Sequence, residues 1–178
     1  MCDLRGFVPS EECFKCDRCC RFSDKETIWS PVFSAQEVEE VINEGYPPAV
    51  FNIGRVGFKD VRLHPKQGLR YSFICPFFDE EKNCCKIYPI RPFDCRLYPF
   101  LIVDMGDGDV FLGLDEQCPY VGKLLTKQNG AEIIDRHSKF LAEFLNSQEG
   151  KECLYKSPQI IARYNGKIRM LAQLDIEI

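Results

Sequence analysis

Eleven cysteines in a chain of 178 residues constrain this sequence more than any other feature. In the first group, Cys13, Cys16 and Cys19 are separated by two residues each, and Cys20 follows directly. This spacing lets successive sulfurs converge on one metal ion or on three corners of an iron–sulfur cube. The second group crosses the middle of the chain, at Cys75, Cys84, Cys85, Cys95 and Cys118. Two cysteine blocks are therefore expected to supply thiolates to a metal centre.

The alternative to metal ligation is a framework of disulfides. The segment from Met1 to Gly6 has no apolar stretch typical of a secretory or lipoprotein signal, so we expect a cytoplasmic protein. The longest uncharged apolar run, residues 97–103, is far shorter than the roughly 20 residues that cross a bilayer, so no membrane partner is expected. A reducing compartment does not preserve disulfides, and an odd number of cysteines cannot pair completely. Metal ligation or thiol catalysis remains, with Cys2 and Cys153 interpreted as ordinary thiols outside both blocks.

Composition and charge restrict the remaining classes of protein. Hydrophobic residues make up 45% of the chain, which suffices for a packed core. Lys and Arg number 23 against 27 Asp and Glu, and the resulting formal net charge of −4 gives no general polyanion-binding surface. We therefore expect a folded protein without a nucleic-acid partner.

Local patterns predict both helices and strands. Ser34 followed by Glu37 is a capping box, which predicts the start of a helix that Gly45 ends. Apolar residues at helical spacing predict a short helix that begins at Pro119 and a longer one over residues 131–145. Cys118 is then expected at a helix N-terminus, where the dipole favours a thiolate.

Strands are expected over residues 53–63 and 70–75, and β-hairpins over residues 100–114 and 160–174. The second hairpin is expected to turn through Asn165-Gly166. The predicted fold class is α+β, a small single domain over residues 1–178 with irregular cysteine-bearing loops around a metal centre, short helices and β-hairpins. Its metal-binding core covers about residues 10–125, and a helix and the C-terminal hairpin cover residues 126–178.

The cysteine blocks also carry specific flanking residues. The first is the run from Cys13 to Cys20, and the later signature consists of Cys75-Pro76, Cys85-Lys86-Ile87-Tyr88, Arg91-Pro92, Cys95-Arg96, Tyr98-Pro99-Phe100 and Cys118-Pro119. In this order the motifs resemble the CxxCxxCC (YkgJ-type) family of zinc- or iron-chelating cysteine-cluster proteins, over roughly residues 10–125. Relatives of that family include flagellin lysine-N-methylases with an iron–sulfur cluster, so the resemblance implies a link to methyl transfer.

The candidate metal ligands are the eight thiolates of Cys13, Cys16, Cys19, Cys20, Cys75, Cys85, Cys95 and Cys118. They suffice for two four-sulfur sites, or for one cluster and a spare set. The three-cysteine run favours an iron–sulfur cluster, [4Fe-4S], over zinc. Adjacent cysteines are expected to point apart, which leaves open whether Cys84 or Cys85 is the ligand. Cations are expected to moderate the charge of the thiolates, and the candidates are Arg18, Arg91 and Arg96.

Two classes of function are consistent with this centre. The first is a metal-binding protein with a structural role or a role in electron or metal handling. The second is a cluster-containing enzyme, either an oxidoreductase or a protein resembling a lysine methyltransferase. The glycine-rich Gly106-Asp107-Gly108 lies in a hairpin with no following helix, which argues against a methyltransferase cofactor loop. His64 and His137 complete no catalytic triad in the sequence, so no catalytic residue is assigned.

Overall fold

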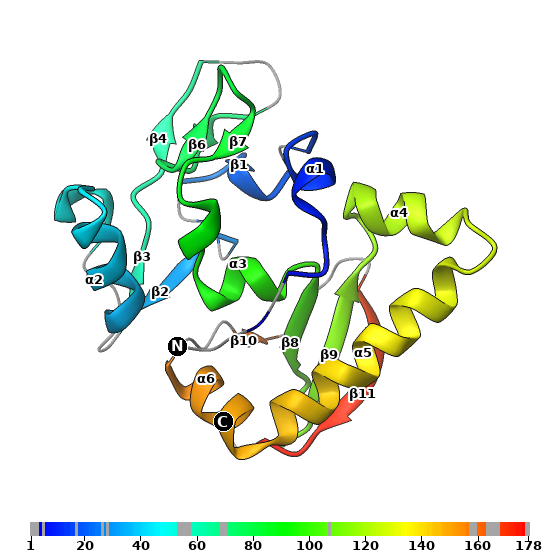
Figure 1. Ribbon diagram of the computed structural model, residues 1–178. Helices are drawn as coiled ribbons and strands as arrows, with labels where there is room; N and C mark the ends of the chain where they lie inside the picture. Colours follow the sequence, from blue (N-terminus) through cyan, green and yellow to red (C-terminus); the bar gives the residue numbers. More distant parts are fainter. Residues whose placement is uncertain are drawn as a thin grey trace. The chain divides into compact units, whose positions relative to one another are not determined.

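The chain forms two compact units in the computed structural model (Figure 1). The structure describes residues 4, 6–16, 18–25, 27, 29–52, 58–67, 71–106, 108–156, 160–162 and 168–176. Unit 1 comprises Met1–Val8 and Arg96–Ile178, and unit 2 comprises Pro9–Cys95. Short helices and small sheets occur in both, which confirms the α+β class. A single domain over residues 1–178 stays a prediction.

Unit 2 is built from short elements. Its helices are α1 (Ser10–Cys13), η1 (Arg18–Cys20), α2 (Ala35–Asn43), η2 (Pro48–Val50) and η3 (Tyr88–Ile90). Its strands are β1 (Arg21–Phe22), β2 (Val32–Ser34), β3 (Phe58–Asp60), β4 (His64–Pro65), β5 (Phe73–Ile74), β6 (Phe78–Asp79) and β7 (Cys84–Cys85). These strands form the antiparallel sheets β1-β5-β4, β2-β3 and β6-β7. The helix α3 (Phe93–Leu97) begins in unit 2 and ends in unit 1.

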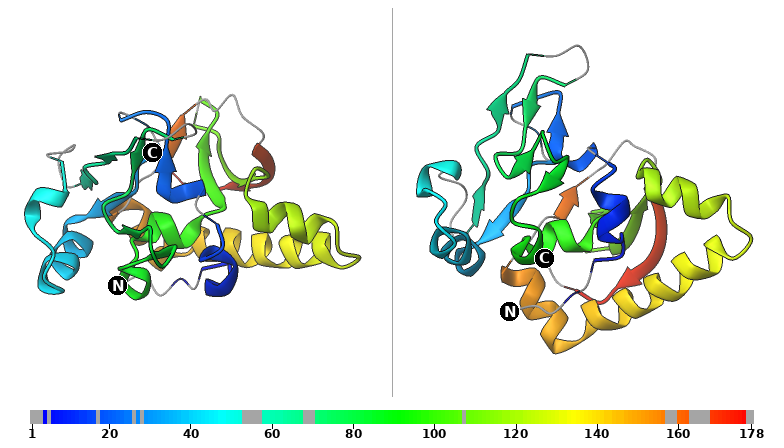
Figure 2. Two further views of the ribbon diagram at one scale, coloured as in Figure 1. Left: turned by 90° about the horizontal axis from the view of Figure 1, so that it is seen from above. Right: turned by 45° about the horizontal axis from the view of Figure 1, so that its top comes forward.

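The predicted capping box starts α2. The Glu37 backbone N–H donates to Ser34 Oγ at 3.3 Å, and the Ser34 backbone N–H donates to Glu37 Oε2 at 2.9 Å. The helix ends before Gly45, whose φ of 94° is accessible to glycine without steric cost. In Figure 2, α2 lies beside β2, the strand that precedes it, and β3, the strand that pairs with β2.

Aromatic packing supports these short elements. Phe33, Phe51 and Phe77 are almost completely buried, and their ring centroids lie 5.2 to 6.0 Å apart. Tyr46 adds a T-shaped contact with Phe77 at 5.2 Å. Strands of two or three residues are too short to be stable alone, so this core holds them in place. The expected strands at 53–63 and 70–75 are present only as β3 and β5, and residues 53–57 and 70 lie outside the described residues.

Unit 1 contains a four-stranded sheet in the order β10-β8-β9-β11. Its elements are β8 (Phe100–Asp104), β9 (Val110–Asp115), α4 (Pro119–Leu125), α5 (Gly130–Asn146), α6 (Gln148–Lys156), β10 (Ile160–Ala162) and β11 (Ile168–Leu174). The predicted hairpin over 100–114 is confirmed as β8 and β9, and the predicted helices are confirmed as α4 and α5. In the described part of the chain, no helix has both the length and the apolar character needed to cross a membrane.

The predicted C-terminal hairpin is wrong. β10 pairs parallel with β8, and β11 pairs antiparallel with β9, so the two strands lie at opposite edges of the sheet. The β8–β9 hairpin leaves backbone groups free to pair along both edges, and each edge takes one later strand. The expected turn at Asn165-Gly166 lies outside the described residues.

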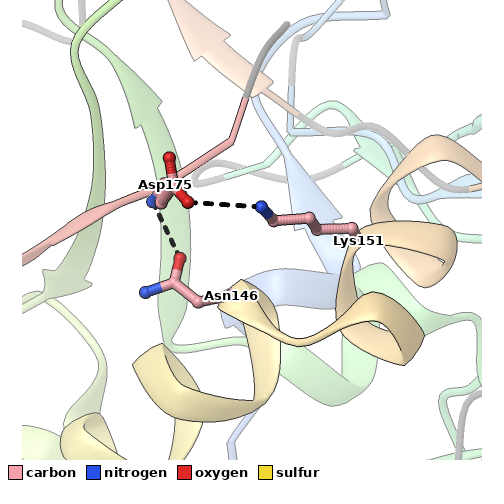
Figure 3. A network of polar contacts seen from close by, with 3 residues as sticks. All are labelled: Asn146, Lys151 and Asp175. Atoms are coloured by element: carbon pink, nitrogen blue, oxygen red, sulfur yellow. Dashed lines mark hydrogen bonds and ion pairs between the residues drawn. The ribbon is translucent and has the colours of Figure 1, made fainter.

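The helix α5 covers the sheet next to β11 (Figure 1). Ile134, Leu141 and Leu145 form its buried face. Where α5 ends, Asn146 Oδ1 accepts a hydrogen bond from the Asp175 backbone N–H at 2.8 Å (Figure 3). Lys151 of α6 pairs with the Asp175 carboxylate at 3.5 Å. These contacts connect the end of β11 to both helices.

Candidate metal centre

The first cysteine block forms a tight loop in unit 2. Cys13 ends α1, and the Cys16 backbone N–H donates to the Cys13 carbonyl at 3.1 Å. Cys19 and Cys20 belong to the single turn of η1. The backbone therefore turns twice between Cys13 and Cys20.

The second block reaches the first through the backbone. Cys75 follows β5, and its N–H donates to the Cys20 carbonyl at 2.9 Å. Cys85 lies in β7, and Cys95 is the third residue of α3. Three different elements therefore present thiols from the second block in the same unit as the first.

A side-chain contact fixes the loop that carries the second block. The Asn83 amide donates to the Phe14 carbonyl, one residue after Cys13. Asn83 has a φ of 49°, a left-handed conformation that asparagine tolerates better than most residues. The turn before Cys84 and Cys85 is thereby attached to the first cysteine loop.

Electrostatic effects show that the thiols share one neighbourhood around Cys19. Burial raises the pKa of the Cys13 thiol to about 12, and nearby Cys19 and Cys16 add to the rise. Burial likewise raises the pKa of Cys75 to about 12, with Cys85 and Cys19 contributing. The pKa values of Cys85 and Cys95 are also raised by burial, and Cys19 adds to both. A centre of this kind strongly favours a bound cation, because several thiolates cannot otherwise ionise side by side.

The two pairs of adjacent cysteines differ from each other. The Cys20 side chain is hydrogen-bonded to Cys19, and this bond is the largest cause of its raised pKa. The expectation that adjacent cysteines point apart is therefore wrong at this pair, because the backbone turns in η1 and brings the side chains together. In the extended strand β7, successive side chains alternate between faces, and Cys19 contributes to the raised pKa of Cys85. Cys85 therefore faces the cluster, and Cys84 is on the opposite side of the strand.

Two predicted features lie in unit 1. Cys118 is buried at the N-cap of α4, as expected, and its role as a ligand stays a prediction. His137 is half-buried among aromatic rings, with ring centroids 4.7 Å from Phe7 and 5.3 Å from Phe100. Burial lowers its pKa. This environment agrees with a packed histidine.

Cys153 corrects one expectation. It was predicted to be an ordinary thiol, but it takes part in a disulfide bond. The other described cysteines are all free thiols. Cys153 is also almost completely buried in α6.

Arg91 contacts one of the candidate thiols. Its Nη1 atom donates to Cys13 Sγ at 3.8 Å, and its guanidinium carbon lies 3.8 Å from the centroid of the Tyr88 ring. Of the other two predicted cations, Arg18 is exposed and Arg96 belongs to unit 1. The structure thus places Arg91 in contact with a candidate ligand.

Two carboxylates accept hydrogen bonds at or near the start of α3, a role that the sequence did not indicate for either residue. Glu37 Oε1 accepts a hydrogen bond from the Phe93 backbone N–H at 2.7 Å, while its other oxygen belongs to the capping box of α2. Asp94 Oδ2 accepts from the Val32 backbone N–H at 3.3 Å. Burial raises the pKa of Asp94 to about 7, and Glu37 and Cys19 contribute to the rise. Both contacts orient the helix that carries Cys95.

The donor set suits a thiophilic metal. Unit 2 brings together soft sulfur donors from α1, η1, β7 and α3, which are the ligands of zinc and of iron–sulfur clusters. Among the residues that the structure describes, no three Cys, His, Asp or Glu side chains stand in an arrangement that encloses a metal ion.

Comparison with known proteins agrees with this chemistry. A family model named CxxCxxCC, with the description "Putative zinc- or iron-chelating domain", matches residues 12–119, more than half of the chain. No curated protein and no solved structure matches the chain. The matched range includes every cysteine of both blocks. The chain therefore belongs to the CxxCxxCC family, and metal binding through cysteine, with zinc or iron as the metal, follows from that membership.

Proposed function

We propose that this protein holds an iron–sulfur cluster on its cysteine thiolates and serves in electron or metal handling. One observation carries the proposal: the backbone hydrogen bond from Cys75 to the Cys20 carbonyl, at 2.9 Å, joins the two separated cysteine blocks within unit 2. The proposed ligands in unit 2 are Cys13, Cys16, Cys19, Cys20, Cys75, Cys85 and Cys95.

The spacing of the first block favours a cluster over a single zinc ion. Three cysteines separated by two residues each, with a distant fourth, suit the corners of a [4Fe-4S] cube. Zinc sites more often combine two separated pairs of cysteines. Cys19 follows the pair Cys13 and Cys16 after two residues. The first block alone can therefore supply three thiolates.

The first experiment is purification without oxygen, followed by measurement of iron, zinc and acid-labile sulfide per chain on one sample. Iron with matching sulfide supports the proposal, whereas zinc without sulfide overturns it in favour of a zinc centre. Reversible bleaching of a visible absorption band on reduction would then indicate a redox-active centre, since zinc has no redox chemistry.

Single substitutions test which thiols hold the metal. Cys16→Ala and Cys95→Ala are expected to lower the metal content per chain, because each removes a thiol from the gathered set. Cys153→Ala is the control, and it is expected to leave the metal content unchanged, because Cys153 is in a disulfide in unit 1. Equal loss in all three variants would show that the ligand grouping is wrong.

A further inference from the structure

Arg91 and Tyr88 form a small assembly beside Cys13 that the ligand set alone does not account for. The Arg91 guanidinium donates to Cys13 Sγ at 3.8 Å and stacks on the Tyr88 ring at 3.8 Å. Arg91 Nε is buried and has no hydrogen-bond partner. A buried guanidinium that leaves one N–H without a partner is costly, so its position beside a sulfur calls for an explanation.

Local backbone geometry places this guanidinium. Tyr88 begins the 3₁₀ turn η3, and Arg91 caps its end three residues later. Side chains three residues apart in a 3₁₀ helix lie one above the other, which brings the guanidinium over the ring. Arg91 has a ψ of 143°, an extended conformation that the following Pro92 favours.

Tyr88 is itself held by the first cysteine loop. Its ring makes a T-shaped contact with Phe14, with centroids 4.9 Å apart and planes at 71°. Phe14 directly follows Cys13, and its carbonyl accepts the hydrogen bond from Asn83. The contacts therefore form a closed path from Cys13 through Phe14, Tyr88 and Arg91 back to the Cys13 sulfur. Within this path, the guanidinium has little freedom to leave the sulfur.

We propose that Arg91 is a positioning residue that raises the reduction potential of the metal centre, acting through its hydrogen bond to Cys13 and supported by Tyr88. This inference rests on the proposed iron–sulfur cluster. One-electron reduction adds one negative charge to a cluster without forming or breaking a bond. A positive charge and an N–H···S hydrogen bond stabilise the reduced state more than the oxidised state, because the sulfurs carry more charge after reduction.

The test compares Arg91→Gln with Arg62→Gln in the full-length protein purified without oxygen. Arg62 is exposed in the same unit, so its substitution changes the net charge equally without touching the thiols. Iron and sulfide are measured first, and the midpoint potential is then titrated with dithionite as electron donor and ferricyanide as electron acceptor. At a fixed potential, Arg91→Gln is expected to lower the ratio of reduced to oxidised centre about tenfold, which corresponds to about 59 mV for one electron.

Two further variants separate tuning from simple structural support. Arg91→Lys keeps the charge but loses the planar stack on Tyr88, so we expect a smaller decrease in potential than for Arg91→Gln. Tyr88→Leu removes the ring that supports the guanidinium and keeps Arg91 as the hydrogen-bond donor. We therefore expect an intermediate decrease in the midpoint potential. If Arg91→Gln loses its cluster, the potentials of these two variants still test the proposal.

Each outcome decides between the two proposals. Wild-type protein with iron and sulfide, together with an unchanged potential in Arg91→Gln, overturns the role of Arg91 and leaves the proposed function intact. Equal shifts in Arg91→Gln and Arg62→Gln also overturn it, since net charge would then be the cause. If every Arg91 and Tyr88 variant only loses iron, without any shift in potential of the centre that remains, Arg91 is structural. Wild-type protein without iron and sulfide overturns the proposed function and this inference with it.

Discussion

Cys84 and Cys85 have different surroundings although they are neighbours in the sequence. Cys85 lies near Cys19 and Arg91, and both influence its thiol. Cys84 pairs with Asp79 in the β6–β7 ladder and is on the other face of the strand. Because the two side chains lie on opposite faces of the strand, we expect only one of them to be a ligand.

We expect Cys85→Ala to lower the metal content and Cys84→Ala to leave it unchanged. The two variants remove the same chemical group one residue apart, so each is the matched control of the other. The measurement is metal per chain by elemental analysis after purification without oxygen. Loss of metal in Cys84→Ala alone would reverse the assignment of the inward-facing thiol.

His137 is expected to make the stability of the protein depend on pH. Burial among aromatic rings disfavours the charged imidazolium, so the pKa is lowered from its ordinary value of 6.5 in the folded state. The unfolded chain then binds the proton more readily as the pH falls through 6.5, and the free energy of unfolding decreases until the pH passes the folded pKa. Above pH 6.5 both states are neutral, and this contribution is constant.

The measurement is urea unfolding of wild type and His137→Gln between pH 5 and pH 8. Wild type is expected to lose stability towards pH 5, and His137→Gln is expected to lose less over the same range. His64→Gln, at an exposed position, is the control with the same change of residue. An identical decrease in wild type and His137→Gln would assign the pH dependence to other groups.

At the level of elements, Glu37 connects the starts of two helices. One carboxylate oxygen belongs to the capping box of α2, and the other accepts from the first backbone N–H of α3. Each N–H lies at a helix N-terminus, where a negative charge is also favoured by the helix dipole. The orientation of α3, and therefore of Cys95, depends on a residue 58 positions earlier in the chain.

Glu37→Ala is expected to lower the free energy of unfolding by about 2 kcal/mol, because it removes a cap and leaves a buried N–H without its acceptor. Glu37→Gln keeps one acceptor oxygen and is expected to cost less. Glu39→Ala, on the exposed side of α2, is the control. The measurement is the urea midpoint at constant slope. Equal midpoints for Glu37→Ala and Glu39→Ala would show that the bond to Phe93 contributes nothing.

The elements that the sequence predicted correctly depend on interactions within a few residues. The capping box of Ser34 and the hairpin of β8 and β9 are of this kind. The hydrogen bond from Phe93 to Glu37 joins residues 56 positions apart, and no local pattern contains it. The C-terminal hairpin failed for the same reason, because the Asn165-Gly166 signal is local whereas the available edges of the sheet are set by β8 and β9.

The candidate site was predictable to a different extent. Spacing and flanking residues identified the cysteine blocks, because the residue type alone shows which side chains can supply thiolate ligands. Which thiols face one another depends on backbone conformation, as the pairs in η1 and β7 show. The disulfide of Cys153 was not indicated by the spacing of the cysteines, because pairing depends on which residues the fold brings together.

For the whole molecule, we expect removal of the metal to lower the melting temperature. The candidate thiols lie on several separate short elements and loops, so a metal that binds them holds these segments together. A ligand that binds only the folded state adds to its stability. The measurement is a thermal melt of the holo-protein with and without a chelator, and chelator saturated with metal is the control. An unchanged melting curve after complete metal removal would contradict this coupling.

The two compact units are completed at different stages of synthesis on the ribosome. Unit 2 is one continuous segment, Pro9–Cys95, so all of its residues have been made before most of unit 1 exists. The sheet of unit 1 acquires both of its edge strands only when residues 160–174 have been made. Since domains generally fold as units during synthesis, the segment with seven of the candidate thiols is complete while the nascent chain is still growing.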